Sequence, residues 1–221
     1  MFRVITIERE YGCGAASIAA QLASHLGWKL WDQSLTDEIA RLANVDPRAV
    51  KRCDERLDST LQRLSRTFWR GSYERGWALA SHIFDTDRMV SMMQEIMNHI
   101  GQEGNAVVVG RGAPYFMREN PRAFHVFLYA PRAEKIRRIM AEGHSSEEAE
   151  ELVDSVDLER IAYVKHYFHA DWPTRSLYHM MLNTAVGNEP VIHTILDTMQ
   201  AVQGAPKATD FEQPKVPTPI R

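Results

Sequence analysis

The chain of 221 residues, with 44% hydrophobic and 25% charged residues, has the composition of a globular protein with one sizeable core, or a core plus a small subdomain. Its formal net charge of −3 argues against a global field that attracts nucleic acid polymers or anionic membranes, so any anion site has to be local. Two cysteines exclude a disulfide framework, and without a signal peptide or a run of roughly 18 apolar residues we expect a soluble cytoplasmic protein.

The chain begins with a strand, a glycine loop, a helix and a second strand. Residues 2–7 are β-branched and apolar, which predicts a buried parallel strand, and residues 28–32 predict a second short strand. Between them apolar residues recur at helical spacing from Ile18 to Leu26, and Gly27 stands where a helix C-cap belongs. These elements form a strand–loop–helix–strand unit.

Strands and helices continue to alternate along the rest of the chain. Further strands are predicted over residues 106–110, 125–130 and 179–183. Further helices are predicted over residues 34–42, 47–64, 89–100, 132–141, 145–167 and 191–199. The alternation predicts an α/β fold with a parallel sheet covered by helices on both faces, whose ligands bind beyond the carboxyl ends of the strands.

The glycine loop after the first strand is similar to a phosphate-binding loop of the pattern G-x-x-x-x-G-K-[ST]. Gly12, Cys13 and Gly14 lie between strand and helix, where backbone N–H groups and the helix dipole favour a phosphate. Ser17 stands where a hydroxyl can meet a phosphate or a magnesium ion, but Ala15 occupies the lysine position. A glycine pair at this point can also be no more than a structural turn.

Arginines follow two other predicted elements. Arg111 lies between two glycines at the end of the most hydrophobic strand, where a planar guanidinium can bind an anion. Arg137 and Arg138 precede a long helical segment that carries Arg160, and this segment is long enough to form a mobile lid. The alternative for all these charges is a solvated helix face or strand end.

Taken together, these motifs resemble the cytidylate-kinase-like family, a branch of the nucleoside monophosphate kinases within the P-loop kinases. The matching pieces are ITIEREYGCGAASIAAQLASHLGWKLWD, VVVGRGAPYFM, VFLYAPRAEKIRRIM and DLERIAYVKHYFHADW through LYHMMLNT. The resemblance covers most of residues 3–200 and implies a five-stranded parallel sheet. It implies one domain over residues 1–203, with a core of 1–34, 104–130 and 177–203, a helical acceptor-binding segment of 35–103, a helical lid of 131–176, and a disordered tail of 204–221.

The activity implied by the resemblance is transfer of the γ-phosphoryl group of ATP to a nucleoside monophosphate, with Mg²⁺ and with CMP or dCMP as the family-level acceptor. The ATP phosphates would be cradled by Gly12, Cys13, Gly14, Ala15, Ala16 and Ser17, with Ser17 reaching Mg²⁺. The acceptor would be contacted by Asp32, Arg111 and Asp157. The transferring group would be covered by Arg137 or Arg138, and by Arg160.

Ala15 leaves the function open to more than one interpretation. The resembling family often lacks the lysine and shows a run like Arg9-Glu10-Tyr11-Gly12, so we hypothesise that Arg9 supplies the missing charge. One alternative is a P-loop kinase for another small acceptor, and another is a non-catalytic nucleotide-binding module that signals to a partner. The retained arginines and Asp157 favour an enzyme.

Overall fold

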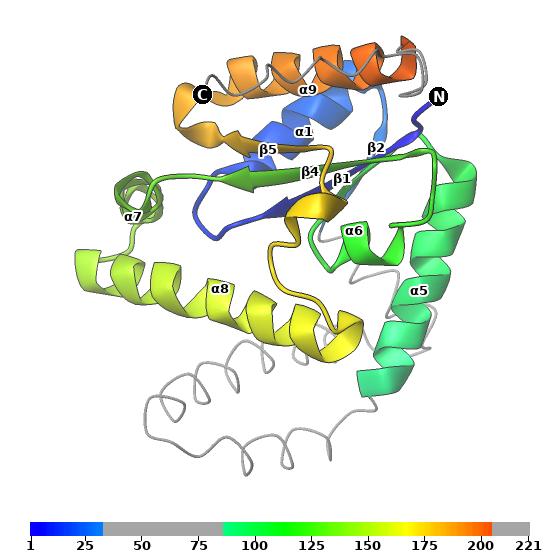
Figure 1. Ribbon diagram of the computed structural model, residues 1–221. Helices are drawn as coiled ribbons and strands as arrows, with labels where there is room; N and C mark the ends of the chain where they lie inside the picture. The colour runs from blue at the N-terminus through cyan, green and yellow to red at the C-terminus, as the bar shows by residue number, and fades with distance from the viewer. Residues whose placement is uncertain (33–85, 205–221) are drawn as a thin grey trace, which may run out of the picture.

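The β-branched run near the start of the chain forms the central strand of a five-stranded parallel sheet (Figure 1). This arrangement comes from a computed structural model, which describes residues 1–32 and 86–204. The strands are β1 (Val4–Arg9), β2 (Lys29–Trp31), β3 (Ala106–Val109), β4 (Ala123–Tyr129) and β5 (Met180–Asn183). They lie in the order β2-β3-β1-β4-β5 and pair in parallel throughout, which confirms the predicted fold class.

Helices cover both faces of this sheet, as the alternating pattern predicts. The helices are α1 (Ala15–Leu26), α5 (Thr86–Glu103), α6 (Ala113–Phe116), α7 (Arg132–Ala141), α8 (Ser146–Phe168) and α9 (Asn188–Gly204), with 3₁₀ turns η1 (Arg175–Leu177) and η2 (Thr184–Val186). Helices α1 and α9 lie on one face, and α5, α6 and α8 lie on the other (Figure 1). No helix within 1–32 or 86–204 combines the length and the apolar character that crossing a membrane requires.

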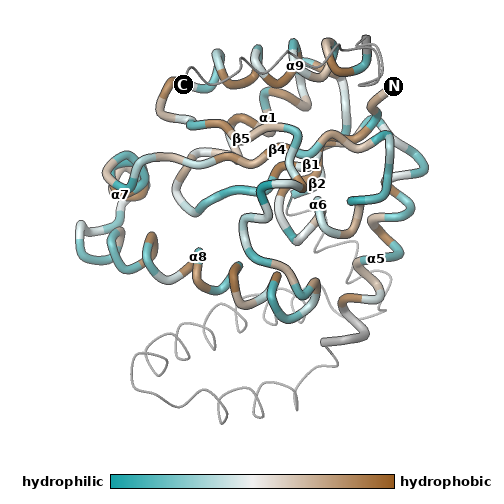
Figure 2. The backbone as a smooth tube through the Cα atoms, viewed as in Figure 1, coloured by the Kyte–Doolittle hydropathy of each residue, from teal (hydrophilic) through white to brown (hydrophobic). Residues whose placement is uncertain are grey.

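Alternate side chains of β1 enter two separate cores. Ile5 and Ile7 pack with α1 and α9, whereas Val4 packs with α5 and α6 on the opposite face. Burial of each such side chain contributes about 1.5–3 kcal/mol to stability. Figure 2 shows the apolar residues along the central strands and alternating apolar and polar segments along α5 and α8. Because both faces are covered, the carboxyl edge of the sheet is where polar groups gather.

Local sequence signals set several helix ends as predicted. Helix α1 ends at Gly27, whose left-handed backbone (φ +63°) lets its N–H bond the last carbonyls. Helix α8 begins with the predicted capping box, in which Ser145 and Glu148 exchange hydrogen bonds of 3.1 and 2.9 Å. The first strand runs from Val4 to Arg9, two residues later than the predicted range 2–7, because its pairing with β4 continues to Arg9. The predicted helices 34–42 and 47–64 lie outside the described residues.

A buried histidine on β4 contacts β1 and the residue that precedes β5. His125 is 3% exposed, and its Nδ1 lies 2.7 Å from the Thr6 Oγ1, while its backbone N–H donates to His179 Nδ1 at 3.0 Å. Burial, with a smaller contribution from His179, lowers the pKa of His125 from 6.5 to about 4. The folded protein therefore holds this imidazole neutral in weak acid.

The His125 environment predicts a specific loss of stability in acid. Because the folded pKa lies below the unfolded one, the unfolded chain binds the proton first, and stability falls as pH drops from about 6.5 to about 4. The loss attributable to this group reaches about 3 kcal/mol. Urea unfolding across this range should show a shallower pH dependence for His125→Gln than for the wild type. Exposed His193 provides the control His193→Gln, and an equal slope in the His125 variant would contradict the assignment.

Candidate functional site

The loop that joins β1 to α1 presents a helix N-terminus at the carboxyl edge of the sheet. Gly14 caps α1 without any side-chain hydrogen bond to its first N–H groups. Uncapped N–H groups at this end carry partial positive charge and are suited to an anion. The neighbouring Cys13 and Ala15 side chains are buried, so this part of the loop shows its backbone rather than its side chains.

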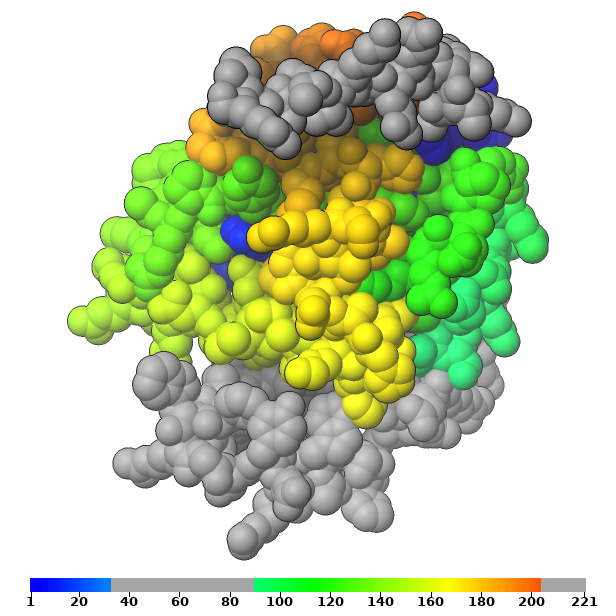
Figure 3. Space-filling view, viewed as in Figure 1, coloured from blue at the N-terminus to red at the C-terminus, as the bar shows by residue number. Residues whose placement is uncertain are grey.

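Helix α7 lies directly against this loop. At Gly12, where φ is +70°, an added Cβ would come within 2.9 Å of Ile139 Cδ1 and 3.2 Å of Lys135 Cβ. Only glycine therefore permits both the backbone conformation and the close approach of the helix. In the space-filling view the segment from α8 onward lies over this face, and a small blue patch of the N-terminal segment is visible beside it (Figure 3).

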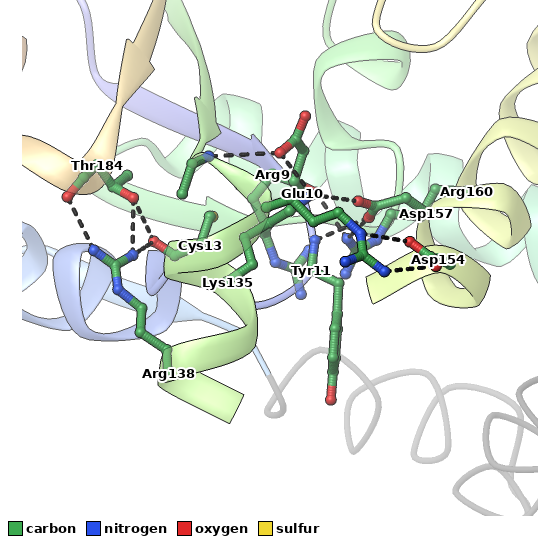
Figure 4. A network of polar contacts seen from close by, with 12 residues as sticks. Arg9, Glu10, Tyr11, Cys13, Lys135, Arg138, Asp154, Asp157, Arg160 and Thr184 are labelled. Carbon is green, nitrogen blue, oxygen red and sulfur yellow. Dashed lines mark hydrogen bonds and ion pairs between the residues drawn. The ribbon is translucent and has the colours of Figure 1, made fainter. Parts of the chain in front are cut away.

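One end of the loop is fixed through the carbonyl of Cys13. This oxygen accepts hydrogen bonds from Thr184 Oγ1 at 2.6 Å and from Arg138 Nη1. The Arg138 guanidinium also bonds the Thr184 Oγ1 and carbonyl, at 2.9 and 3.1 Å (Figure 4). It pairs with Glu134 on its own helix as well. Burial raises the pKa of the Cys13 thiol to about 11, so it is a neutral packing group at physiological pH.

The other end of the loop is held by α8 through a carboxylate. Asp157 Oδ1 accepts the Tyr11 backbone N–H at 2.9 Å and Arg160 Nη1 at 2.6 Å. The same arginine donates to the Arg9 carbonyl at 2.9 Å, and Lys135 Nζ lies 3.6 Å from Asp157 Oδ2 (Figure 4). A backbone N–H, a guanidinium and an ammonium thus converge on one anion, which shows that this position accepts negative charge.

Three arginines share the carboxyl edge of the sheet next to the loop. The guanidinium of Arg9 lies over Gly110, where any Cβ would overlap its Nη1 atom. Burial lowers the pKa of Arg9, and repulsion from Arg160 and Arg111 adds to the effect, while Glu8 and Asp32 partly offset it. Three guanidinium groups therefore gather at this edge of the sheet, together with the carboxylates of Glu8 and Asp32.

The structure separates the remaining predicted residues. Arg137 is 68% exposed and pairs with Glu134 at 2.7 Å, so its guanidinium lies away from the loop. Ser17 is exposed, and its hydroxyl accepts hydrogen bonds from Gln21 and Asn188, both at 3.0 Å. Ala16 is exposed on the first turn of α1. Within the two described ranges no cluster of three histidine, cysteine or carboxylate side chains that could hold a metal ion occurs.

Sequence reasoning missed the roles of Lys135, Glu10 and Thr184 in this site. Lys135 pairs with Glu10 at 3.0 Å, and Thr184 anchors the loop carbonyl. One signal was available for Lys135, since it shares a helical face with Arg138 and Ile139, directly after a buried strand. The hollow of about 360 Å³ lined by Phe2, Ala123 and His179 lies instead at the amino-terminal edge of the sheet, away from these groups.

The order of the strands and the glycine loop after β1 define a P-loop kinase fold. A family model described as the cytidylate kinase-like family matches residues 4–186, and the chain belongs to this family. No curated protein matches the chain.

Two solved structures illustrate the likeness of the fold. An uncharacterized protein from Eubacterium ventriosum ATCC 27560 is 19% identical, with a TM-score of 0.66, over 91% of this chain and 99% of that one. A shikimate kinase from Acinetobacter baumannii in complex with shikimate is 14% identical, with a TM-score of 0.50, over 93% and 97%. At these identities the likeness concerns the fold alone.

The bond from Thr184 to the loop predicts a stability loss without a change of shape. Thr184→Val keeps the side-chain volume but removes the hydroxyl that the Cys13 carbonyl and Arg138 share, and it should cost about 1–3 kcal/mol of unfolding free energy. Urea denaturation measures this. Thr194→Val is the matched control, because its hydroxyl makes only a local bond to Pro190 on an exposed turn. Equal effects in the two variants would show that the anchor contributes nothing.

Proposed function

We propose that this protein transfers the γ-phosphoryl group of Mg·ATP to a nucleoside monophosphate, with CMP or dCMP as the first acceptors to test. The observation that carries the proposal is the convergence of Arg9, Arg111 and Arg160 beside a glycine loop covered by two helices. Phosphoryl transfer needs little covalent chemistry, but it needs neutralised charge and aligned reactants, which such an arrangement supplies. Membership of the cytidylate kinase-like family supports the same reaction class.

The residues divide into a donor side and an acceptor side. On the donor side, residues 12–17 would hold the ATP phosphates through backbone N–H groups, and Ser17 would face Mg²⁺, which neutralises phosphate charge when bound. Arg138 would keep the loop in shape through the Cys13 carbonyl and remains close to Gly14. Arg137 could act only after leaving Glu134, which makes it the weaker catalytic candidate.

On the acceptor side, Asp32, Arg111 and Asp157 would contact the nucleoside monophosphate. Arg9 and Arg160 would then lie between the two nucleotides and stabilise the transferring group, since both belong to the positive cluster at the sheet edge. Closure of α7 and α8 would exclude the water that competes with the acceptor.

A second candidate function is a non-catalytic nucleotide-binding module. Ala15 favours it, because the loop itself carries no lysine to meet the β- and γ-phosphates. The arginine cluster favours the enzyme, because signalling by nucleotide binding alone needs fewer phosphate-directed cations.

Phosphorus NMR of the full chain with Mg·ATP and single acceptors tests the proposed reaction. CMP, dCMP, UMP, AMP, GMP and a panel of phosphate-free alcohols are added one at a time. We expect ADP to appear together with the nucleoside diphosphate of the acceptor, for one or two of the monophosphates. Binding of Mg·ATP without any phosphorylated product would favour the non-catalytic module, and a phosphorylated alcohol would identify a kinase for another small acceptor.

Arg160→Ala should lower turnover strongly while Mg·ATP still binds. Loss of a preorganised charge at a transition state typically reduces kcat by about 100- to 1000-fold. Steady-state kinetics and calorimetry measure the two effects separately. Lys165→Ala, at an exposed position of the same helix, is the control and should leave both unchanged. Near-normal turnover in Arg160→Ala would remove α8 from the catalytic assignment.

A further inference from the structure

We infer that Lys135, on α7, is the cation that meets the β- and γ-phosphates of the donor in place of the lysine missing at position 15. The inference rests on the proposed function and adds a phosphate-binding residue to its donor site. It depends on where α7 lies, on the partners of the Lys135 ammonium, and on the contrast with Arg9.

The loop cannot supply this charge from position 15. Ala15 is 4% exposed and packs in the core between the sheet, α1 and α9. Its side chain therefore belongs to the interior, while only the loop backbone is left for an anion. A cation for the donor phosphates has to reach the loop from another element.

Lys135 reaches the loop from α7. Its Cβ lies 3.2 Å from the position of a Cβ added at Gly12, so the side chain starts at the loop itself. Its Nζ lies between Glu10, before the glycines, and Asp157 on α8, at 3.0 and 3.6 Å. Figure 4 shows the side chain extended along the loop toward these two groups.

Among the lysines in residues 1–32 and 86–204, Lys135 alone is buried. Its side chain is 10% exposed, whereas Lys29 is exposed over the ring of Trp31 and Lys165 is exposed on α8. Burying an ammonium is costly unless partners compensate it, so a buried lysine is a poor choice for mere solubility. Because Lys135 lies against the loop, we infer that its ammonium binds an anion there.

The ammonium has capacity for a further anion. A lysine has three N–H donors, and within the described residues the Lys135 Nζ makes one hydrogen bond, to Glu10. Its 3.6 Å separation from Asp157 exceeds ordinary hydrogen-bond length. Asp157 meanwhile takes the Tyr11 N–H and Arg160, donors that also face the loop. The two remaining N–H groups of the ammonium can therefore bind phosphate oxygens at the loop, while Asp157 keeps its bonds to Tyr11 and Arg160.

Arg9 is directed toward β3. Its guanidinium rests over Gly110, at the end of that strand, and its charged neighbours are Arg160, Glu8, Asp32 and Arg111. That location suits the acceptor and the transferring group. The affinity of Arg9→Met for Mg·ATP, set beside that of Lys135→Met, decides which of the two residues replaces the missing lysine.

Calorimetric titration of the full chain with Mg·ATP, Mg·ADP and AMP tests the inference. Lys135→Met should weaken Mg·ATP and Mg·ADP by about 10- to 100-fold, the range for one charge-assisted hydrogen bond, and AMP by less than about 3-fold. Lys135→Arg should keep Mg·ATP affinity within about 5-fold of the wild type, because it restores the charge. Lys165→Met is the matched control and should change nothing.

The outcomes separate this inference from the proposed function. If the wild type binds Mg·ATP and Lys135→Met binds it equally well, Lys135 has no such role and the kinase proposal stands. If AMP weakens as much as ATP, the lysine only supports the fold of the loop, and the inference fails. A strong loss in Arg9→Met without one in Lys135→Met assigns the charge to Arg9. If the wild type binds no Mg·ATP, both proposals fall. Should Lys135→Met not fold, Lys135→Gln keeps a hydrogen bond to Glu10 and is subject to the same expectations.

Discussion

The central place of β1 in the sheet is the constraint on which the rest of the structure depends. β3 and β4 pair with β1 on either side, helices cover both of its faces, and the charged residues of the strand, Glu8 and Arg9, stand at its carboxyl end. Glu8 illustrates the cost of this position: it is 3% exposed, and burial raises its pKa although Arg9 and Arg160 partly oppose the effect. Arg9 and Glu10, which follow Glu8, lie where the ends of β1, β3 and β4 meet helices α7 and α8.

The loop after β1 owes its shape to elements far away in the chain. Arg138 on α7 and Thr184 after β5 hold its last part, and Asp157 on α8 holds its first part. Helices α7 and α8 are in turn linked by Arg132, which bonds Asp154 at 2.9 Å and Glu150 at 3.4 Å. Helices α7 and α8 therefore contact each other as well as the two ends of the loop.

Local patterns predicted much of the fold because they depend on near neighbours. The glycine loop, the cap at Gly27 and the capping box at Ser145 were visible in short windows, and the joint motifs indicated the family. Contacts across 125 or 171 positions, such as Lys135 with Glu10 and Thr184 with Cys13, leave no local pattern. Arg137 and Arg138 are chemically identical neighbours, and only the packing of α7 turns one toward Glu134 alone and the other toward the loop. The acceptor-binding assignment of 35–103 falls largely outside the described residues.

The burial of Ala15 also bears on how this loop can evolve. A lysine introduced there would carry its charge into a packed apolar core, with a penalty of several kcal/mol for an unpaired buried ion. The side chains around it would have to change at the same time, so the substitution of Ala15 by lysine is expected to be tolerated only together with changes in the core that surrounds it.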